Sequence, residues 1–473
     1  MPSATTLLST WETLVASAPD ARALIESASG EIHARAALQV RATALASSLS
    51  GSALNAGGPV YSGDRVVFSR PNGPDWLAAF LALLQLGAVP VPLDPSEPSS
   101  SQRSLAEAID ADFLLLPDNR LEPLSHRPSA GRRQRRHENP TTSAAGLALI
   151  KLTSGSTGTP RALPFTHAQM LADGRQICAS MDIRPDDLNL ALIPFGHSYG
   201  LGNLVLPLLA QGTPVVCVSA PLHHAIADDC ARWQPTVFPA VPAILRILAL
   251  TDVPAESLQS LRVVISAGST LPPATAQAFS QKFGRLIHGF YGSSETGGIT
   301  YDRSGEATLT GRSVGTPLVG VTLRFTRARR FTVASAAVVT RGNRRRSPGG
   351  HGAHMPADLA ELNAHGELVL LGRTGRMIKI ASRRLDLTAL EQEIKILPGI
   401  RDAYTAPHPD RPEELACALA CDLSATEARA LLQRSLAAWK IPKRLIVLKD
   451  FPLTPRGKPD TRALRATLNP AAP

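Results

Sequence analysis

Three short segments combine hydroxyls, glycines and charged side chains in patterns suited to phosphate chemistry. The first, Thr153 to Arg161 (TSGSTGTPR), directly follows an apolar run of strand length, Leu147 to Leu152. Its backbone amides and hydroxyls can surround phosphate oxygens, and Arg161 adds positive charge. The Gly-Lys-Ser/Thr ending of a Walker A loop is absent, which disfavours a P-loop ATPase or kinase. A Ser/Thr/Gly-rich turn without a ligand is the alternative.

The second segment, Gly289 to Gly298 (GFYGSSETGG), packs an aromatic ring, hydroxyls and a carboxylate between glycines. Tyr291 can offer a flat ring to a base, Ser294 a donor to a phosphate, and Glu295 an oxygen ligand to Mg²⁺. The third segment, Pro452 to Asp460 (PLTPRGKPD), presents Lys458 in a loop punctuated by Pro and Gly. Such a lysine can be placed over a reacting group, or it can be an ordinary solvated charge.

The elements that must position these segments follow an α/β rhythm. Apolar runs of strand length alternate with helical patterns, which predicts α/β structure with largely parallel sheets. A helix is predicted over Trp76–Leu86. The predicted strands are Val66–Ser69, Val89–Leu93, Leu147–Leu152, Leu190–Pro194, Pro214–Val218 and Val263–Ser266.

After Arg373 the pattern changes to about 100 residues of α+β character, enough for a separate domain. We expect strands near 377–380, 403–406, 416–420 and 444–448, and helices over 386–396 and 426–439. The predicted division is a large domain of residues 1–374 and a small mobile C-terminal domain of residues 375–473. Between Phe325 and His354 basic runs interrupt the rhythm, and we expect poor order there.

Composition excludes several classes of protein. The chain of 473 residues is 44% apolar and 19% charged, which excludes disorder. Its charge of +10 comes largely from two local arginine clusters without interleaved aromatics, which disfavours nucleic-acid binding. Five cysteines without a CxxC pair argue against a disulfide framework or a zinc site and favour a cytoplasmic location. We expect neither a secretion signal nor a membrane span.

Together, the segments resemble the adenylate-forming (ANL) superfamily of acyl-CoA synthetases, peptide-synthetase adenylation domains and firefly luciferase. The resemblance extends over nearly the whole chain, because further landmarks stand in the family's order. These landmarks are GAVPVPLDP (87–95), PFGHSYGLG (194–202), SAGSTLP (266–272), VGTPLVGV (314–321), PADL (356–359) and GELVLLGRTGRMIKI (366–380).

The resemblance implies that the chain joins a carboxylate to ATP, giving acyl-AMP and pyrophosphate, and then passes the acyl group to CoA or a phosphopantetheine thiol. It implies that Lys458, Ser294, Glu295 and His197 are catalytic, with Glu295 holding Mg²⁺. It places the nucleotide on Thr153, Ser154, Gly155, Ser156, Thr157, Gly158, Arg161, Gly268, Tyr291, Gly292, Asp358 and Arg373. His197 has an alternative interpretation as a partly buried histidine bonded to a backbone carbonyl.

Three positions depart from the family pattern. Arg161 stands where a lysine is usual, which keeps the charge. Gly375 replaces an acidic or basic residue at the expected pivot, and Ser382 replaces a glycine that normally lines the thiol tunnel. The last two departures concern the thiol step more than adenylation.

The acid is expected to be fatty or aryl, because Gly196 follows Phe195 where amino-acid-activating domains have an aspartate. Part of Phe238–Ile247 and of Ser266–Ser269 is expected to line its pocket. Two alternatives are a ligase that hands acyl-AMP to a carrier protein or an amine without CoA, and a nucleotide-binding homologue of low turnover. An acidic acyl carrier protein is a possible partner for the run Arg132–Arg136.

Overall fold

The computed structural model divides the chain into two compact units. The first comprises Met1–Leu323 with Val333–His354, and the second comprises Arg324–Thr332 with Met355–Pro473. The structure describes residues 5–51, 58–95, 97, 99–124, 146–153, 161–339, 352–373, 376–380, 383–409, 411, 414–436, 438–454 and 457–469. The boundary that the sequence predicts at residue 375 stays a prediction.

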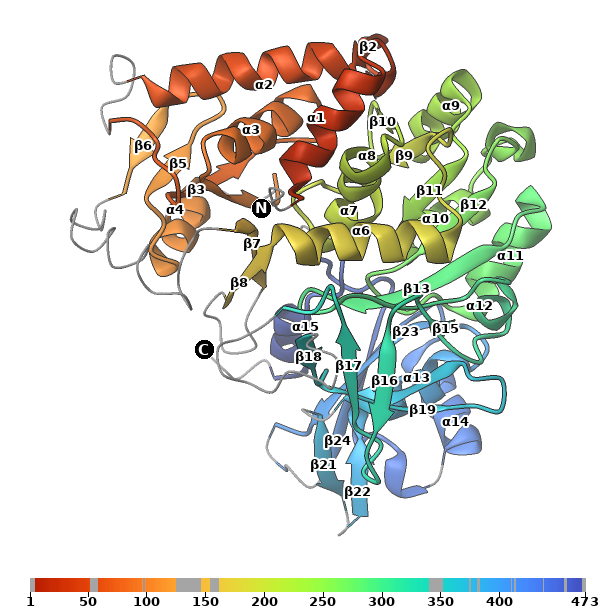
Figure 1. Ribbon diagram of the computed structural model, residues 1–473. Coiled ribbons are helices and arrows are strands. Elements are labelled where there is room, and N and C mark those ends of the chain that lie inside the picture. The colour runs from red at the N-terminus through yellow and green to blue at the C-terminus, as the bar shows by residue number, and fades with distance from the viewer. Residues whose placement is uncertain are drawn as a thin grey trace. The chain divides into compact units, whose positions relative to one another are not determined.

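A nine-stranded sheet is the centre of the first unit (Figure 1). In spatial order its strands are β15 (Thr316–Pro317), β14 (Gly297–Tyr301), β13 (Ile287–Ser293), β12 (Val263–Ser266), β11 (Val237–Ala240), β9 (Asn189–Ala191), β10 (Val215–Cys217), β1 (Arg22–Glu26) and β2 (Glu31–Ala34). The strands from β13 to β1 pair in parallel, and the pairs at both edges are antiparallel. Every residue of β9, β10, β11 and β12 is buried, as expected of parallel strands covered on both faces.

Helices provide the apolar partners of these strands. The described α-helices of the first unit are α1 (Leu7–Ser17), α2 (Arg35–Ser50), α3 (Pro74–Gln85), α4 (Ser99–Ala108), α6 (His167–Met181), α7 (Ser198–Gly200), α8 (Leu206–Gln211), α9 (His223–Trp233), α10 (Pro242–Leu250), α11 (Pro273–Phe283) and α12 (Glu306–Thr310). One continuous core joins side chains of the sheet, such as Phe238 and Val264, to Leu245 and Phe279 on the helices.

The first unit also contains a four-stranded sheet and a two-stranded hairpin. The four-stranded sheet has the order β4 (Val89–Leu93), β3 (Arg65–Ser69), β5 (Phe113–Leu115) and β6 (Leu121–Pro123), and β7 (Leu147–Thr153) forms an antiparallel hairpin with β8 (Arg161–Thr166). Helix α6 begins immediately after β8. Thr166 and Gln169 form a capping box at its start, which satisfies two amide groups that a helix end leaves free.

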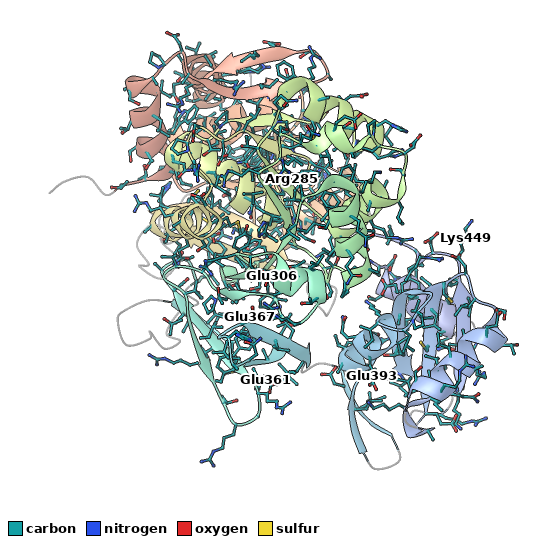
Figure 2. The ribbon with its side chains drawn as sticks, turned by 90° about the vertical axis from the view of Figure 1, so that its right-hand side faces the viewer. Arg285, Glu306, Glu361, Glu367, Glu393 and Lys449 are labelled. Carbon is teal, nitrogen blue, oxygen red and sulfur yellow. The ribbon has the colours of Figure 1, made fainter. Side chains whose placement is uncertain are left out.

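The second unit contains three sheets and three α-helices among its described residues. Its elements are β19 (Asp358–Leu362), β20 (Leu368–Arg373), β21 (Met377–Ile380), β22 (Arg383–Asp386), α13 (Leu387–Lys395), β23 (Ile400–Pro407), β24 (Leu415–Cys421), α14 (Ala425–Ser435), β25 (Arg444–Leu448) and α15 (Thr461–Leu468). Apolar residues of α13 and α14 pack on the β23–β24–β25 sheet. Glu393 lies on α13, and Lys449 follows the last residue of β25 (Figure 2).

The predicted α/β class with largely parallel sheets is confirmed, and most predicted elements form within a few residues of their expected bounds. The strand expected over 190–194 stops at Ala191, because Pro194 begins a turn in which its carbonyl accepts from the His197 amide. The helix expected over 426–439 ends at Ser435, where Leu436 takes an extended conformation.

The expectation of poor order over 325–354 is wrong for its described part. Strand β17 (Phe331–Ser335) pairs with β18 (Gly352–His354), and the β17 side chains Phe331 and Val333 are fully buried. The sheet also includes β16 (Thr322–Phe325). Alternate burial along β17 explains its formation, because Phe331, Val333 and Ser335 point to one face. Residues 340–351 lie outside the described residues.

Candidate functional site

Several segments expected to bind nucleotide follow the carboxyl ends of neighbouring parallel strands. Strand β9 leads to His197, β12 leads to Gly268, and Tyr291 and Gly292 lie in the last residues of β13. In parallel α/β sheets, ligands bind in the crevice beyond the carboxyl ends of the strands. The topology therefore brings these segments to the same end of the sheet, where the parallel strands have their carboxyl ends.

A direct hydrogen bond joins two of the expected site segments. The Ser198 hydroxyl donates to the Ser294 hydroxyl at 3.0 Å, although the two residues are 96 positions apart in the chain. Next to Ser198, Nδ1 of His197 accepts from the Tyr199 amide at 3.2 Å. The Glu295 carbonyl accepts from the Val339 amide at 2.9 Å. His197, Ser294 and Glu295 are half-buried. The three hydrogen bonds above fix these residues or their immediate neighbours in place.

Tyr199, the residue after Ser198, connects this segment to β11 and β12. Its hydroxyl lies 3.3 Å from the Ala240 carbonyl at the end of β11 and 3.1 Å from the Ile265 carbonyl in β12. Its ring centroid is 6.0 Å from that of Phe290. Burial raises the pKa of Tyr199 well above its usual value, so the phenol is a neutral donor. Tyr199 was not predicted as a site residue, although it stands two positions after His197.

Two glycines in the site have backbone that a side chain would disturb. A Cβ on Gly292 would lie 2.6 Å from the Gly297 carbonyl oxygen, where β13 turns into β14. Gly268 has φ +91°, a conformation that glycine adopts without strain. Both residues are exposed.

The β7–β8 hairpin holds the two ends of the predicted phosphate loop. Thr153, the last residue of β7, is the register partner of Arg161, the first residue of β8. Arg161 is exposed. Ser154, Gly155, Ser156, Thr157 and Gly158 lie outside the described residues.

In the second unit, the two residues expected at the ribose are neighbours. Asp358 begins β19, Arg373 ends β20, and the two are register partners in an antiparallel pair. The two residues are 15 positions apart in the chain, and the pairing of β19 with β20 brings them together.

Lys458 lies in a tight loop of the second unit. Its carbonyl accepts from the Thr454 amide at 2.7 Å, and a bridge between Leu453 and Pro459 closes the loop. The Lys458 side chain is exposed. Gly457, with φ +69°, supplies the left-handed backbone of the turn.

Two buried charged residues beside these segments were missed by the sequence analysis. Lys151 lies on β7 and is 5% exposed, and Asp173 lies on α6 and is 3% exposed. Burial lowers the pKa of Lys151 and raises the pKa of Asp173, and in each case the opposite charge of the partner opposes the shift. A lysine inside the apolar run Leu147–Leu152 was the available signal, because charged residues are rarely buried without a partner.

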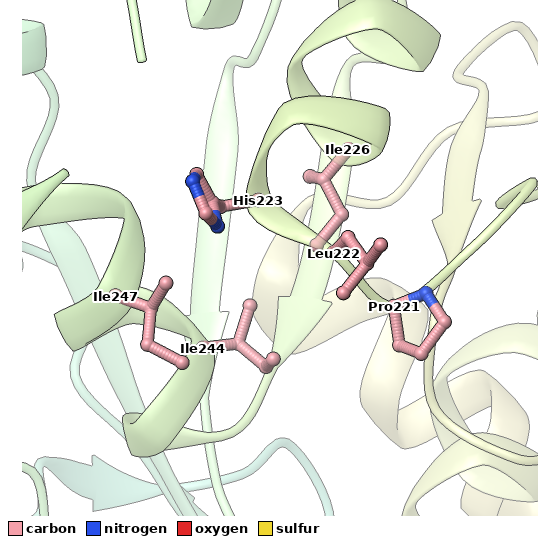
Figure 3. Close-up of a pocket in the computed structure, with 6 residues that line it drawn as sticks. All are labelled: Pro221, Leu222, His223, Ile226, Ile244 and Ile247. Atoms are coloured by element: carbon pink, nitrogen blue, oxygen red, sulfur yellow. The ribbon is translucent and has the colours of Figure 1, made fainter. Parts of the chain in front are cut away.

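A separate small pocket has a different character. Its volume is about 80 Å³, and it is lined by Pro221, Leu222, His223, Ile226, Ile244 and Ile247 at the starts of α9 and α10 (Figure 3). This apolar lining offers no cluster of donors for phosphates. Two groups of possible metal ligands, His223 with His224 and Asp252, and Glu26 with Glu31 and His33, contain no residue of the predicted site. Within the described residues, no helix is both long and apolar enough to cross a bilayer.

Comparison with known proteins identifies the family. The family model described as AMP-binding enzyme matches residues 11–326. The L-proline--[L-prolyl-carrier protein] ligase of Streptomyces coelicolor is 28% identical over 477 aligned residues, covering 87% of this chain and 89% of that protein. The salicyl-AMP ligase / salicyl-S-ArCP synthetase of Mycobacterium tuberculosis is 25% identical, covering 86% of this chain and 81% of that protein.

Solved structures show the same fold. The crystal structure of ATP-bound MatB from Rhodopseudomonas palustris superposes with a TM-score of 0.80 at 21% identity, covering 98% of each chain. The fold, the order of the sequence landmarks and the family match over residues 11–326 agree. The chain therefore belongs to the AMP-binding enzyme family of adenylate-forming ligases.

Proposed function

We propose that the protein activates a small carboxylic acid with ATP and then transfers the acyl group to a thiol. The observation that carries the proposal is the hydrogen bond from Ser198 to Ser294 at the carboxyl edge of the parallel sheet. It joins the PFGHSYGLG and GFYGSSETGG segments, which are expected to hold the acid and the nucleotide respectively. In the first step a carboxylate oxygen attacks the α-phosphorus of ATP, a new P–O bond forms, and the bond to pyrophosphate breaks.

This step brings two anions together, so donors and cations must offset the developing charge. We assign Ser294 as a donor to the α-phosphate and Lys458 as the cation that contacts both reacting oxygens. Tyr291 stacks on adenine, and the Asp358–Arg373 pair contacts the ribose. Thr153 to Gly158, with Arg161, surround the β- and γ-phosphates.

The residues present fit a magnesium ion. Glu295 offers a half-buried carboxylate directly after Ser294, and carboxylate oxygens are the ligands that Mg²⁺ prefers. The ion, held by Glu295, neutralises phosphate charge when bound. His197 is assigned to the mouth of the acid pocket, where its ring is oriented by the Tyr199 amide.

In the second step a thiolate attacks the acyl carbonyl carbon, a thioester forms, and AMP leaves. We propose the phosphopantetheine thiol of a carrier protein as the acceptor, because two relatives that cover more than four fifths of both chains are named for carrier proteins. The alternative acceptor is CoA. The name of a relative that acts on salicylate supports an aryl acid as substrate, and that of the prolyl ligase supports proline as a second candidate.

A cytoplasmic location stays part of the proposal. It is supported by the thiols, because all five cysteines are free and buried, as is usual in a reducing compartment.

An acid panel tests the proposal. The purified chain is incubated with MgATP, labelled pyrophosphate and, in turn, salicylate, benzoate, octanoate, L-proline and L-phenylalanine. We expect acid-dependent exchange of label into ATP with at least one aryl acid. If none of the acids supported exchange, the proposed function would be overturned. If L-proline alone supported exchange, the second candidate substrate would be selected.

The acceptor is then identified with the acid that exchanges. Thioester formation is followed by mass spectrometry with CoA and with a phosphopantetheinylated carrier protein, and the carrier without its prosthetic group is the control. We expect acylation of the loaded carrier. Acyl-CoA as the only product would assign the CoA alternative, and AMP release without any thioester would indicate transfer to an amine.

A further inference from the structure

One side chain beside the four-stranded sheet holds the main chain that leads from β9 to His197. Asn72 lies in the short loop between β3 and α3 (Figure 1). Its Nδ2 donates to the Ala191 carbonyl at 3.3 Å and to the Ile193 carbonyl at 2.9 Å, and its Oδ1 accepts from the Phe195 amide at 2.7 Å. A single side-chain amide therefore satisfies three main-chain groups where β9 ends.

Packing fixes the same segment, residues 191–196, by independent contacts. The buried Phe195 ring lies edge-on to the Trp76 ring, with the two centroids 5.4 Å apart. Trp76 is fully buried and belongs to α3. Gly196 lies against the end of β4, because a Cβ at this residue would be 2.6 Å from the Leu93 carbonyl oxygen. The segment is therefore held against α3 and the four-stranded sheet by ring and main-chain contacts.

His197 directly follows this segment. Its amide donates to the Pro194 carbonyl at 3.0 Å, and its carbonyl accepts from the Leu201 amide at 2.8 Å. Its Nδ1 accepts from the Tyr199 amide at 3.2 Å, which orients the ring. Because one of these contacts returns to the segment itself, a displacement of residues 191–196 would be transmitted to the His197 ring.

We propose that Asn72 is a positioning residue for the acid, which holds residues 191–196 so that the His197 ring stays at the mouth of the acid pocket. The inference rests on the proposed function, in which His197 is assigned to that place. Asn72 itself is assigned no contact with the acid or with ATP. An asparagine suits this role, because its amide supplies both donors and an acceptor, whereas an aspartate has no donor and an alanine has neither.

Acid-dependent pyrophosphate exchange by the full-length chain tests the proposal, with the acid that the panel identifies. Asn72→Asp keeps the acceptor and loses both donors, and Asn72→Ala loses all three hydrogen bonds. We expect KM for the acid to rise about tenfold in each variant. KM for MgATP should stay within about threefold of the wild-type value, because the nucleotide is assigned to other segments. An unchanged KM for the acid in both variants would overturn the proposal.

A double-mutant cycle tests whether Asn72 acts through His197. His197→Ala is made alone and together with Asn72→Ala. Once the ring is removed, Asn72 has no ring to position, so Asn72→Ala should raise KM for the acid by less than about threefold in the His197→Ala background. Effects of the two substitutions that multiply in the double variant would show that Asn72 does not act through His197.

Gln211→Ala is the matched control for stability. The half-buried side-chain amide of Gln211 donates to the Ile183 carbonyl and to the Thr213 hydroxyl, each at 2.8 Å. Ile183 precedes β9 and Thr213 precedes β10, at the opposite end of these strands from His197. We expect this variant to have a lower melting temperature and an unchanged KM for the acid. A KM raised as much as in Asn72→Ala would assign the effect to lost stability and reject positioning.

Hydrogen exchange of the substrate-free chain separates this proposal from the proposed function. The peptide that contains the Phe195 amide should exchange its amide hydrogens faster in Asn72→Ala than in the wild type, because this amide loses its acceptor. Equal rates would show that Asn72 does not hold the segment. If no acid supported pyrophosphate exchange by the wild-type chain, the proposed function would fail, and the hydrogen-exchange rates would still decide whether Asn72 fixes residues 191–196.

Discussion

At the scale of the residue, the catalytic proposal depends most on Lys458. The lysine is exposed, and the loop that carries it is closed by main-chain contacts that do not use its ammonium group. Removal of the side chain leaves these main-chain contacts in place. Contacts made chiefly in the transition state contribute to kcat more than to substrate binding.

We expect Lys458→Ala to lower the rate of acid-dependent pyrophosphate exchange by about 10² to 10³, because it removes a charge-assisted contact to the reacting oxygens. Initial rates at saturating MgATP and acid measure the effect, and the melting temperature should stay unchanged. Lys449→Ala is the control, since Lys449 is another exposed lysine of the second unit. A Lys458→Ala variant with wild-type activity would remove this lysine from the mechanism.

At the scale of the element, the second unit contains an ion pair between Arg376, the residue before β21, and Glu391 on α13. Arg376 makes two hydrogen bonds to the Glu391 carboxylate, at 2.7 and 2.8 Å. The same carboxylate accepts from the Thr405 hydroxyl at 3.1 Å, so it also fixes β23 against the helix. Glu391 is 6% exposed, and water therefore cannot replace these partners.

We expect Glu391→Ala to lower the free energy of unfolding of the second unit by about 3 to 5 kcal/mol, because it leaves a partly buried arginine without its counter-ion. Urea unfolding followed by hydrogen exchange of peptides from β23 and α13 measures this change. Arg411→Ala, which breaks an exposed pair with Glu414, should change stability by less than about 1 kcal/mol. Equal effects of the two substitutions would contradict the assignment.

The elements also show what the sequence can and cannot predict. Strands such as Val263–Ser266 were predicted because fully buried strands are continuous apolar runs. The phosphate loop and the Ser294–Glu295 turn could be proposed from the sequence because their chemistry is contained in a few consecutive residues, and their roles stay predictions. Contacts between distant segments, such as that from Ser198 to Ser294, depend on topology and leave no local pattern. Asp173 was missed because a carboxylate in a helix is usually on its solvent face.

At the scale of the whole molecule, no cysteine is available to solvent, and burial alters the titration of most of them. Burial raises the pKa of Cys178 and of Cys230 to about 12, against an ordinary value of 9.0. The native state therefore keeps these protons at pH values where the unfolded chain has lost them. Their contribution to stability is complete below pH 9 and is lost as the pH rises from 9 to about 12.

We expect the free energy of unfolding to fall above pH 9 with a contribution of up to about 1.4 kcal/mol per pH unit from each such thiol. Urea unfolding of the wild type and of Cys178→Ala between pH 8 and pH 10.5 measures the slope. The variant should be less stable at pH 8 because it loses buried atoms, and its alkaline slope should be shallower. Parallel slopes would show that Cys178 does not titrate on unfolding.

Because all five cysteines are buried, the chain is suited to site-specific labelling with fluorescent dyes at introduced cysteines. A maleimide dye should leave the native thiols unmodified and react with new ones placed at exposed positions, such as Glu306→Cys on α12 and Lys449→Cys beyond β25. One position lies in each compact unit. Single-molecule energy transfer between such dyes would follow the distance between the units through a catalytic cycle, without any background substitution of the wild-type sequence.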